Sequence, residues 1–161
     1  MAGIESETIA RLLAEHGPQL LLFAQTWSKN PSDAVQEVFV NLALRSNLPE
    51  NPVAWLFGAT RKRALHLARG EARLVRRQQL ASRPEATPSP GYLESEQKLD
   101  AETALQLLPN DLREIVIARL WGGLSFEEVG KLVNLPSATA WRRYDEALEL
   151  LKHHLAQGER P

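Results

Sequence analysis

Residues 124–144 constrain the fold of this chain more than any other stretch of the sequence. Ser125 is followed three residues later by Glu128, the spacing of a capping box, in which each side chain binds the other residue's backbone amide where a helix starts. Apolar residues then recur at helical spacing, and they are Phe126, Val129, Leu132 and Val133. The pattern therefore predicts a short helix that begins directly after Ser125.

The end of this short helix and the start of the next are also marked. Gly130 costs about 1 kcal/mol in a helix relative to alanine, so we expect a second segment to approach it closely. Asn134 can take the left-handed conformation that ends a helix, and Pro136 suits a turn or a first helical position. The following helix is expected to expose Ser137, Ala138, Trp141, Arg142 and Asp145 and to bury Ala140, Tyr144, Ala147, Leu148 and Leu151.

Two short helices joined in this way have the outline of a helix-turn-helix, a motif that places its second helix in the major groove of DNA. A helical hairpin with a solvated basic face has the same outline. This stretch alone therefore leaves both interpretations open.

Basic residues are concentrated near the middle of the chain. The whole sequence carries 19 Lys and Arg against 20 Asp and Glu, which gives a formal net charge of −1. Between Arg61 and Arg83, however, one acidic residue, Glu71, stands among eight basic ones: Arg61, Lys62, Arg63, Arg69, Arg73, Arg76, Arg77 and Arg83. Lys62, His66, Arg69 and Arg73 fall on one helical face, which we call the basic stripe. Such a block suits contact with a polyanion, and a disordered basic linker is the alternative.

Helical periodicity dominates the rest of the chain, so we expect an all-α fold. Helices are predicted at 5–16, 19–27, 31–45 and from 52 to at least 69, with a break at Gly17-Pro18. A capped turn is expected at Asn30, and Asn51 is placed to cap the helix that Pro52 begins. Further helices are predicted at 101–108 and at 109–121, the latter ended by a glycine pair at 122–123.

This organisation predicts two small helical domains joined by a flexible linker, the second containing the helix-turn-helix. The expected boundaries are 1–77 for the first domain, 78–98 for the proline-containing linker and 99–161 for the second domain.

Several classes of protein are disfavoured by what the sequence lacks. There is no cysteine, so disulfides and thiolate metal sites are excluded. No apolar run approaches the ~20 residues of a membrane span, and the N-terminus does not resemble a signal peptide, so we expect a cytoplasmic protein without membrane insertion. The four histidines have no acid–base or metal-ligand spacing, and no glycine-rich phosphate loop is present. We therefore expect no catalytic residue, no metal site and no cofactor, and the chain is not expected to be an enzyme.

Blocks spread along the chain resemble bacterial RNA polymerase sigma factors of the extracytoplasmic-function type, which have only the second and fourth sigma domains. Residues 33–40 (DAVQEVFV) are similar to the family's core-polymerase-binding helix. Residues 51–57 (NPVAWLF), followed by a basic triplet at 61–63, resemble its promoter-melting helix. Residues 108–114 and 121–128 are similar to the start of its last domain. The resemblance covers nearly the whole chain apart from the expected linker.

This resemblance implies a transcription initiation factor that binds core RNA polymerase and directs it to promoters by recognising their -10 and -35 elements. The implied polymerase-binding residues are Asp33, Gln36, Glu37 and Asn41. Those implied for the -10 element are Arg61, Lys62, Arg63, Arg69 and Arg73, and those for the -35 element are Ser137, Thr139, Trp141, Arg142 and Arg143. The sequence leaves open whether an anti-sigma protein is a further partner.

The chain departs from the family pattern at a few positions. Lys62 and His66 stand where members often carry Asn and Asp, and Trp141 replaces an expected polar residue, so the promoter sequence cannot be carried over. Trp55 could stack on a base, although its place beside Leu56 favours core packing. The alternative function is a one-component helix-turn-helix transcription regulator with an N-terminal sensor or dimerisation domain, for which the basic block would have no evident use.

Overall fold

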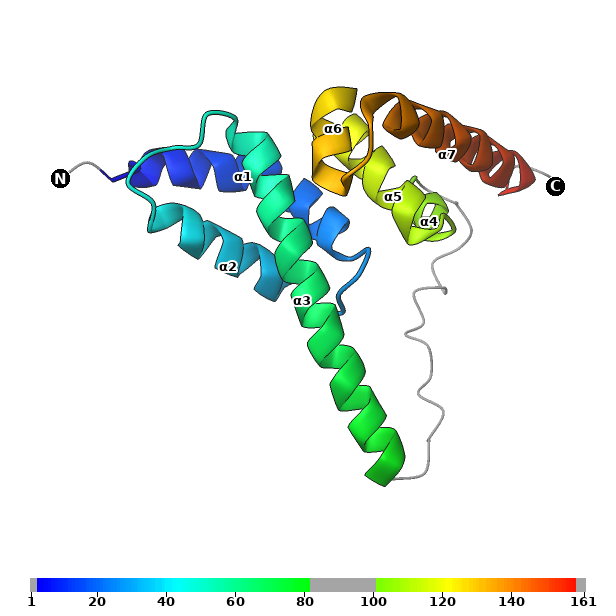
Figure 1. The fold of residues 1–161 in the computed structure, drawn as a ribbon, viewed down its shortest axis with the longest axis horizontal. Helices are drawn as coiled ribbons and strands as arrows, with labels where there is room; N and C mark the ends of the chain where they lie inside the picture. Colours follow the sequence, from blue (N-terminus) through cyan, green and yellow to red (C-terminus); the bar gives the residue numbers. More distant parts are fainter. Residues whose placement is uncertain (1–2, 82–100, 159–161) are drawn as a thin grey trace.

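The computed structural model describes residues 3–81 and 101–158, and all regular structure within these ranges is helical (Figure 1). The expected all-α fold is confirmed. In chain order the elements are α1 Ser6–Ala24, α2 Pro31–Ala43, α3 Pro52–Ala81, α4 Ala101–Gln106, α5 Asn110–Val116, the π-helical turn η1 Ile117–Trp121, α6 Phe126–Val133 and α7 Ser137–Gly158. Among these described helices, none has the combination of length and hydropathy that spanning a membrane requires.

The N-terminal half consists of α1, α2 and α3, which pack around a common apolar interior. The apolar stripe of α2 faces inward as its spacing predicts, because Val35, Val38, Phe39 and Leu42 are all buried. Helix α3 begins with Pro52, and the Asn51 Oδ1 accepts the Ala54 N–H at 3.2 Å, so the predicted cap is confirmed. The far end of α3 runs well beyond α1 and α2 (Figure 1).

Helix α1 is continuous, so the predicted break at Gly17-Pro18 is wrong. Pro18 lies inside the helix, where it removes only one backbone donor, and Gly17 is buried against the side chain of Leu13. Buried residues on both sides of the proline, Leu12 and Leu20, anchor the helix to the core. Tertiary packing of the apolar face therefore outweighs the local cost of the proline.

A carboxylate from α3 organises the turn between α1 and α2. The Oε1 of Glu71 accepts hydrogen bonds from the Ser28 hydroxyl at 2.7 Å, the Lys29 N–H at 3.1 Å and the Asn30 Nδ2 at 2.9 Å. The capped turn expected at Asn30 is wrong in this detail, because its side chain makes no cap bond and turns to Glu71 instead. The acidic residue of the basic block thus joins the start of α2 to α3.

The C-terminal half consists of α4, α5, η1, α6 and α7. The helix expected at 109–121 is present, but its last turn widens into η1, where the Gly122 N–H reaches the Ile117 carbonyl at 3.0 Å. Helix α3 ends at Ala81, four residues past the expected domain boundary at Arg77. The remaining residues of the expected linker lie outside the described ranges.

The helix-turn-helix forms as predicted. Both bonds of the capping box are present, with the Ser125 N–H donating to Glu128 Oε1 at 2.8 Å and the Glu128 N–H donating to Ser125 Oγ at 3.1 Å. Asn134 ends α6 in the left-handed conformation, with φ of 60°. A Cβ at Gly130 would lie 2.5 Å from the Leu135 carbonyl oxygen, which confirms the expected close approach.

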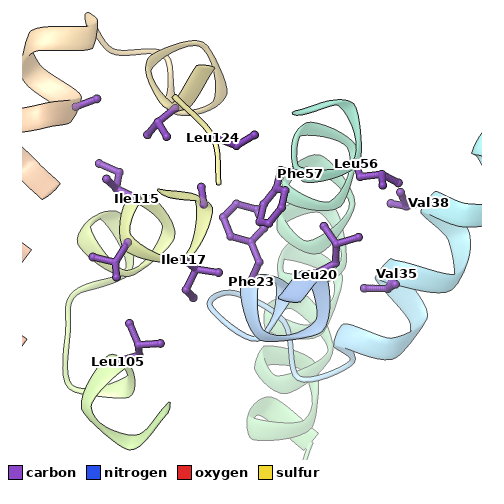
Figure 2. Close-up of a cluster of buried hydrophobic side chains, with 14 of the residues drawn as sticks. Leu20, Phe23, Val35, Val38, Leu56, Phe57, Leu105, Ile115, Ile117 and Leu124 are labelled. Atoms are coloured by element: carbon purple, nitrogen blue, oxygen red, sulfur yellow. The ribbon is translucent and has the colours of Figure 1, made fainter. Parts of the chain in front are cut away.

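The two halves share one apolar interior (Figure 2). The rings of Phe23 in α1 and Phe57 in α3 meet edge to face, with centroids 4.9 Å apart. From the C-terminal half, Ile117 and Leu124 are buried in the same cluster. A Cβ at Gly122 would lie 2.7 Å from the Phe57 ring, so only glycine at this position leaves room for the ring. We call the contact between the N-terminal and C-terminal halves the seam.

Gly130→Ala tests the tight turn of the helix-turn-helix. We expect the variant to lose about 1–3 kcal/mol of unfolding free energy, because the added methyl group overlaps a backbone carbonyl that cannot move freely. The matched control is Gly58→Ala in α3, where an added Cβ meets nothing within 4 Å and helix propensity should add up to about 1 kcal/mol. Urea unfolding of both variants measures the difference. A Gly130→Ala protein as stable as the wild type would contradict the structure of this turn.

Glu71→Gln tests the turn that Glu71 holds. Burial acts to raise the pKa of Glu71, but hydrogen bonds from Ser28, Lys29 and Asn30 outweigh it and leave the pKa below its ordinary value of 4.5. Ionised Glu71 therefore stabilises the fold above the unfolded-state pKa, and this contribution is lost as the pH falls through the lower folded-state pKa. Melting temperatures measured against pH should show the wild type ahead of Glu71→Gln near neutrality and the gap closing below about pH 4. The exposed residue Glu50, changed to Gln, controls for the loss of one charge, and a gap that does not change with pH would refute the assignment.

Candidate nucleic-acid and protein interfaces

The first two turns of α7 project a side-chain face into solvent. Ser137, Ala138, Trp141, Arg142 and Asp145 are all exposed, as the helical spacing predicts. On the opposite face Ala140 and Ala147 are buried, and the Tyr144 ring packs against Phe126 of α6 with centroids 5.3 Å apart. Helix α6 thus packs against the buried face of α7. The exposed face in the N-terminal half of α7 is left available to a partner.

The residues expected to contact the -35 element divide into two groups. Ser137, Trp141 and Arg142 lie on the exposed face, and the Trp141 side chain is 52% exposed. Thr139 and Arg143 are half-buried: Thr139 Oγ1 accepts from Arg142 Nη2 at 3.3 Å, and Arg143 pairs with Asp111 of α5 at 2.9 Å. Of the two arginines named for this element, Arg142 is therefore the exposed one, whereas Arg143 is paired with Asp111.

The basic stripe is exposed along α3. Lys62, His66, Arg69 and Arg73 are all exposed, and their spacing of four, three and four residues keeps them on one face. At 1.5 Å of rise per residue the stripe extends over about 16 Å. A row of basic side chains of this length suits the repeated negative charge of a nucleic-acid backbone.

The other two residues expected to contact the -10 element do not join the basic stripe. Arg63 pairs with Glu37 of α2, which ties the predicted polymerase-binding helix to α3. Arg61 turns toward the C-terminal half, where its Nε donates to Glu114 Oε2 at 2.7 Å. Both guanidinium groups therefore contact carboxylates of this chain.

The residues expected to bind polymerase lie along α2. Asp33, Gln36 and Asn41 are exposed, and Glu37 is half-buried beside Arg63. Sequence reasoning missed two large apolar side chains, since Val40 on the same helix is 58% exposed and Leu44, directly after its end, is 79% exposed. Val40 lies three residues after Glu37 and Leu44 three residues after Asn41, so helical spacing would have placed both beside predicted polar residues.

A shallow cavity of about 280 Å³ lies where α2 meets α3. Val38 and Ala59 line it together with polar residues from both predicted sites: Asn41, Lys62, Arg63 and His66. The structure thus brings the predicted polymerase-binding helix directly beside the basic stripe. Trp55 lies elsewhere, half-buried against the core with the Arg45 guanidinium 5.3 Å from its ring centroid, so the expected core packing is confirmed.

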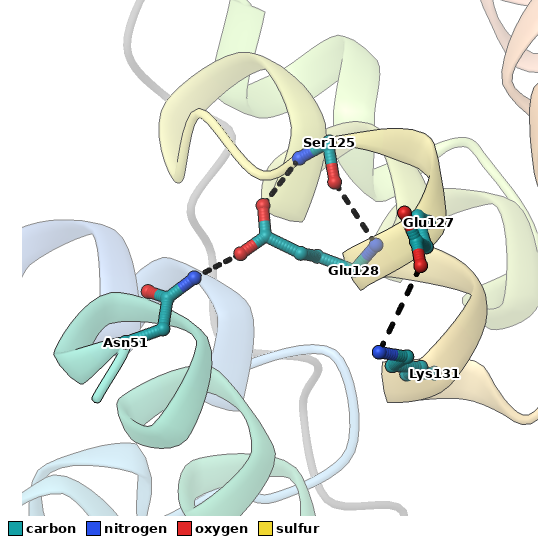
Figure 3. Close-up of polar contacts among 5 residues, drawn as sticks. All are labelled: Asn51, Ser125, Glu127, Glu128 and Lys131. Carbon is teal, nitrogen blue, oxygen red and sulfur yellow. Dashed lines mark hydrogen bonds and ion pairs between the residues drawn. The ribbon is translucent and has the colours of Figure 1, made fainter. Parts of the chain in front are cut away.

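Two acidic residues of the C-terminal half also contact the N-terminal half, and sequence reasoning missed this role for both. Glu114 is only 5% exposed, and its burial raises its pKa while the hydrogen bond and charge of Arg61 oppose the rise. Glu128 binds the Asn51 side chain across the seam (Figure 3), and the Ser125 N–H lowers its pKa. The sequence does contain a signal for Glu114, because this acidic residue stands among the apolar residues Leu112, Ile115, Val116 and Ile117 and is therefore placed on a segment that is expected to be buried.

The described residues contain no group of three or more His, Cys, Asp or Glu side chains suited to hold a metal ion. The described residues present two exposed faces, one with Arg142 in the N-terminal half of α7 and one with the basic stripe of α3. This chemistry suits binding to a long anionic partner.

Comparisons with known proteins agree with this geometry. The family described as Sigma-70, region 4 matches residues 98–151, which include the helix-turn-helix. The ECF RNA polymerase sigma factor SigE of Mycolicibacterium smegmatis is 26% identical over 157 residues, covering 91% of this chain and 61% of the relative. The chain therefore spans about three-fifths of the length of this curated relative.

Two solved structures share the fold. The sigma factor RpoE of Bartonella quintana, determined in complex with the anti-sigma factor NepR, superposes with a TM-score of 0.70 at 23% identity, covering 97% of this chain and 100% of that one. CnrH, determined in complex with the cytosolic domain of CnrY, superposes with a TM-score of 0.61 at 22% identity, covering 96% of this chain and 91% of the other.

The matched region includes the helix-turn-helix, the relative aligns along most of the chain, and the two solved folds extend over both halves. Residues 98–151 are therefore similar to region 4 of the Sigma-70 family, and the chain has the fold of RpoE and CnrH.

Proposed function

We propose that this protein is a transcription initiation factor that binds core RNA polymerase and directs it to promoters by contacting their -10 and -35 elements. The observation that carries the proposal is the presence of two exposed surfaces in one chain whose residues 98–151 match the Sigma-70, region 4 family. One is the face of α7 formed by Ser137, Trp141 and Arg142, which we call the recognition face, and the other is the basic stripe on α3. The SigE relative, whose name describes an RNA polymerase sigma factor, supports the same role.

In this proposal the N-terminal half of α7 enters the major groove at the -35 element. The Arg142 guanidinium can donate to guanine O6 and N7 together, a contact worth about 1–3 kcal/mol of discrimination between bases. Exposed Trp141 offers an apolar surface to a thymine methyl or a sugar edge. Ser137 directs its hydroxyl group toward the base edges, and Thr139 and Arg143 lie nearer the backbone.

The basic stripe contacts the -10 element, with Lys62, Arg69 and Arg73 neutralising phosphates. Each phosphate that a cation neutralises releases counterions, so binding should weaken steeply as salt rises. Arg61 and Arg63 also belong to the proposed contact set, but each must first give up its carboxylate partner.

Helix α2 provides the docking face for polymerase. Asp33, Gln36, Glu37 and Asn41 supply polar contacts, and exposed Val40 and Leu44 add apolar area beside them. An interface of this composition buries apolar surface at its centre and keeps polar groups at its rim.

The proposed role is one of binding, and polymerase carries out the phosphoryl transfer. We assign polymerase and -10 binding to residues 1–77 and -35 binding to residues 99–161, with 78–98 connecting them. The proposed site of action is the cytoplasm, where the polymerase works. Because RpoE was determined with an anti-sigma factor, we propose that a protein of this kind also binds the present chain.

Gln36→Ala combined with Glu37→Ala tests the docking face. We expect about tenfold weaker binding to core RNA polymerase, since an interface loses about 1.4 kcal/mol when central polar contacts are truncated. Affinity of the purified chain for core enzyme measures the effect. The matched control is Gln106→Ala with Glu102→Ala, an exposed pair of the same residue types on α4.

A wild-type protein that does not co-purify with core polymerase would contradict the proposed function and favour a one-component transcription regulator. Equal affinity of the α2 double variant and the wild type would show that docking uses another face.

Arg142→Ala tests the recognition face. We expect the base preference of the chain to relax at one or two positions of the -35 element, because a bidentate contact to guanine is lost. Binding selection from randomised duplex DNA measures the preference, with exposed Lys152→Ala on the same helix as the control. An unaltered preference would show that α7 is aligned differently on the groove.

A further inference from the structure

The ion pair between Arg61 and Glu114 joins the two halves of the chain in a buried setting. Arg61 lies on α3 and Glu114 on α5, and the two residues are 53 positions apart in the sequence. The Arg61 Nε donates to Glu114 Oε2 at 2.7 Å, and Nη2 lies 3.5 Å from Oε1. The Glu114 side chain is 7% exposed and the Arg61 side chain 29% exposed. Removing one partner would therefore leave the other charge largely shielded from water.

The guanidinium of Arg61 is held on a second side as well. It lies 5.7 Å from the ring centroid of Trp27, which belongs to the N-terminal half. Arg61 would keep its contact with Trp27 if the halves separated. Of these two contacts, the bond to Glu114 is the one that requires the halves to be closed. Separation of the halves would expose the same cation beside the start of the basic stripe.

A second polar contact across the seam has the same polarity. Asn51, at the start of α3, donates to the Glu128 carboxylate from the capping box of α6 (Figure 3). In both polar links the N-terminal half donates hydrogen bonds and a carboxylate of the C-terminal half accepts them. Along α3, Phe57 stands between Asn51 and Arg61 in the sequence, and its ring contacts the turn at Gly122.

We propose that the Arg61–Glu114 pair is a latch that holds the two halves closed and withholds Arg61 from nucleic acid. The carboxylate of Glu114 occupies the position on Arg61 that a phosphate oxygen would take, since both anions accept charge-assisted hydrogen bonds from a guanidinium. Binding of Arg61 to a phosphate and closure of the halves then exclude each other. The phosphate half of this proposal rests on the proposed function, whereas the closure half does not.

The consequence is a coupling between opening and DNA binding. A ligand shifts a two-state equilibrium only by its differential affinity for the two states. The open state offers phosphate one cation more than the closed state, so nucleic acid favours opening. By the same linkage, a partner that separates the halves raises the affinity for DNA.

The experiment breaks the pair from each side. Glu114→Gln keeps the shape of the side chain and releases the cation, whereas Arg61→Gln breaks the same pair and removes the cation. Because the chain has no cysteine, Ala14→Cys and Lys152→Cys supply a single pair of spin-label sites on exposed positions of the two halves. We expect a single short label separation in the wild type and an added population at longer distance in both variants.

DNA binding then separates the two variants. The probe is a single-stranded oligonucleotide of mixed sequence, with binding measured against salt concentration. Glu114→Gln should show a slope of log K against log salt steeper by about 0.7, the increment for one added phosphate contact on a single strand. Arg61→Gln should show no steeper slope than the wild type. Glu127→Gln, which removes an equal charge from an exposed pair on α6, controls for net charge and should neither open the chain nor match Glu114→Gln.

Unchanged label distances in both variants would overturn the latch. Opening in Glu114→Gln with a salt slope equal to that of Glu127→Gln would overturn the competition with phosphate. Opening without DNA binding by any variant would contradict the proposed function and leave the closure supported. If Glu114→Gln loses its helical circular dichroism, the charge exchange of Arg61→Glu with Glu114→Arg replaces it, and the short distance should return in the exchanged protein but not in Arg61→Glu alone.

Discussion

The ring of Phe57 packs against the turn at Gly122, where a Cβ would lie 2.7 Å from the ring, and it also meets the ring of Phe23 edge to face with centroids 4.9 Å apart. Protein interiors are close-packed, so a contact with no spare volume fixes the positions of the elements that make it. Phe57 belongs to α3, which carries the basic stripe, and Gly122 directly precedes the helix-turn-helix. The orientation of one predicted DNA-binding surface relative to the other therefore depends on this seam.

Charge is divided between the seam and the outer surface of the molecule. At the seam, Glu114 binds Arg61 and Glu128 binds Asn51, so carboxylates of the C-terminal half engage donors of the N-terminal half. On the outer face of α3, Lys62, His66, Arg69 and Arg73 are exposed. A chain of net charge −1 can in this way present a strongly basic surface to DNA, because attraction at short range depends on local and not on total charge.

Local signals in the sequence predicted the helix-turn-helix well, because each feature depends on near neighbours. The capping box, the left-handed Asn134 and the close approach at Gly130 are all determined within about ten residues of chain. The errors arose where distant contacts decide the outcome. Packing of Leu12 and Leu20 keeps α1 helical through Pro18, and Glu71 draws the Asn30 side chain away from its expected cap. The partners of Arg61 and Arg63 could not be inferred for the same reason, and the residues proposed for polymerase and DNA binding stay predictions.

We propose that one chain carries both the polymerase-docking surface and the surfaces that select a start site. Start-site mapping with purified core RNA polymerase on a library of genomic promoters tests this proposal. We expect that adding this protein yields transcripts from a defined set of promoters that share two sequence elements at a constant spacing. Transcripts that begin at the same positions with and without the protein would refute the proposed role.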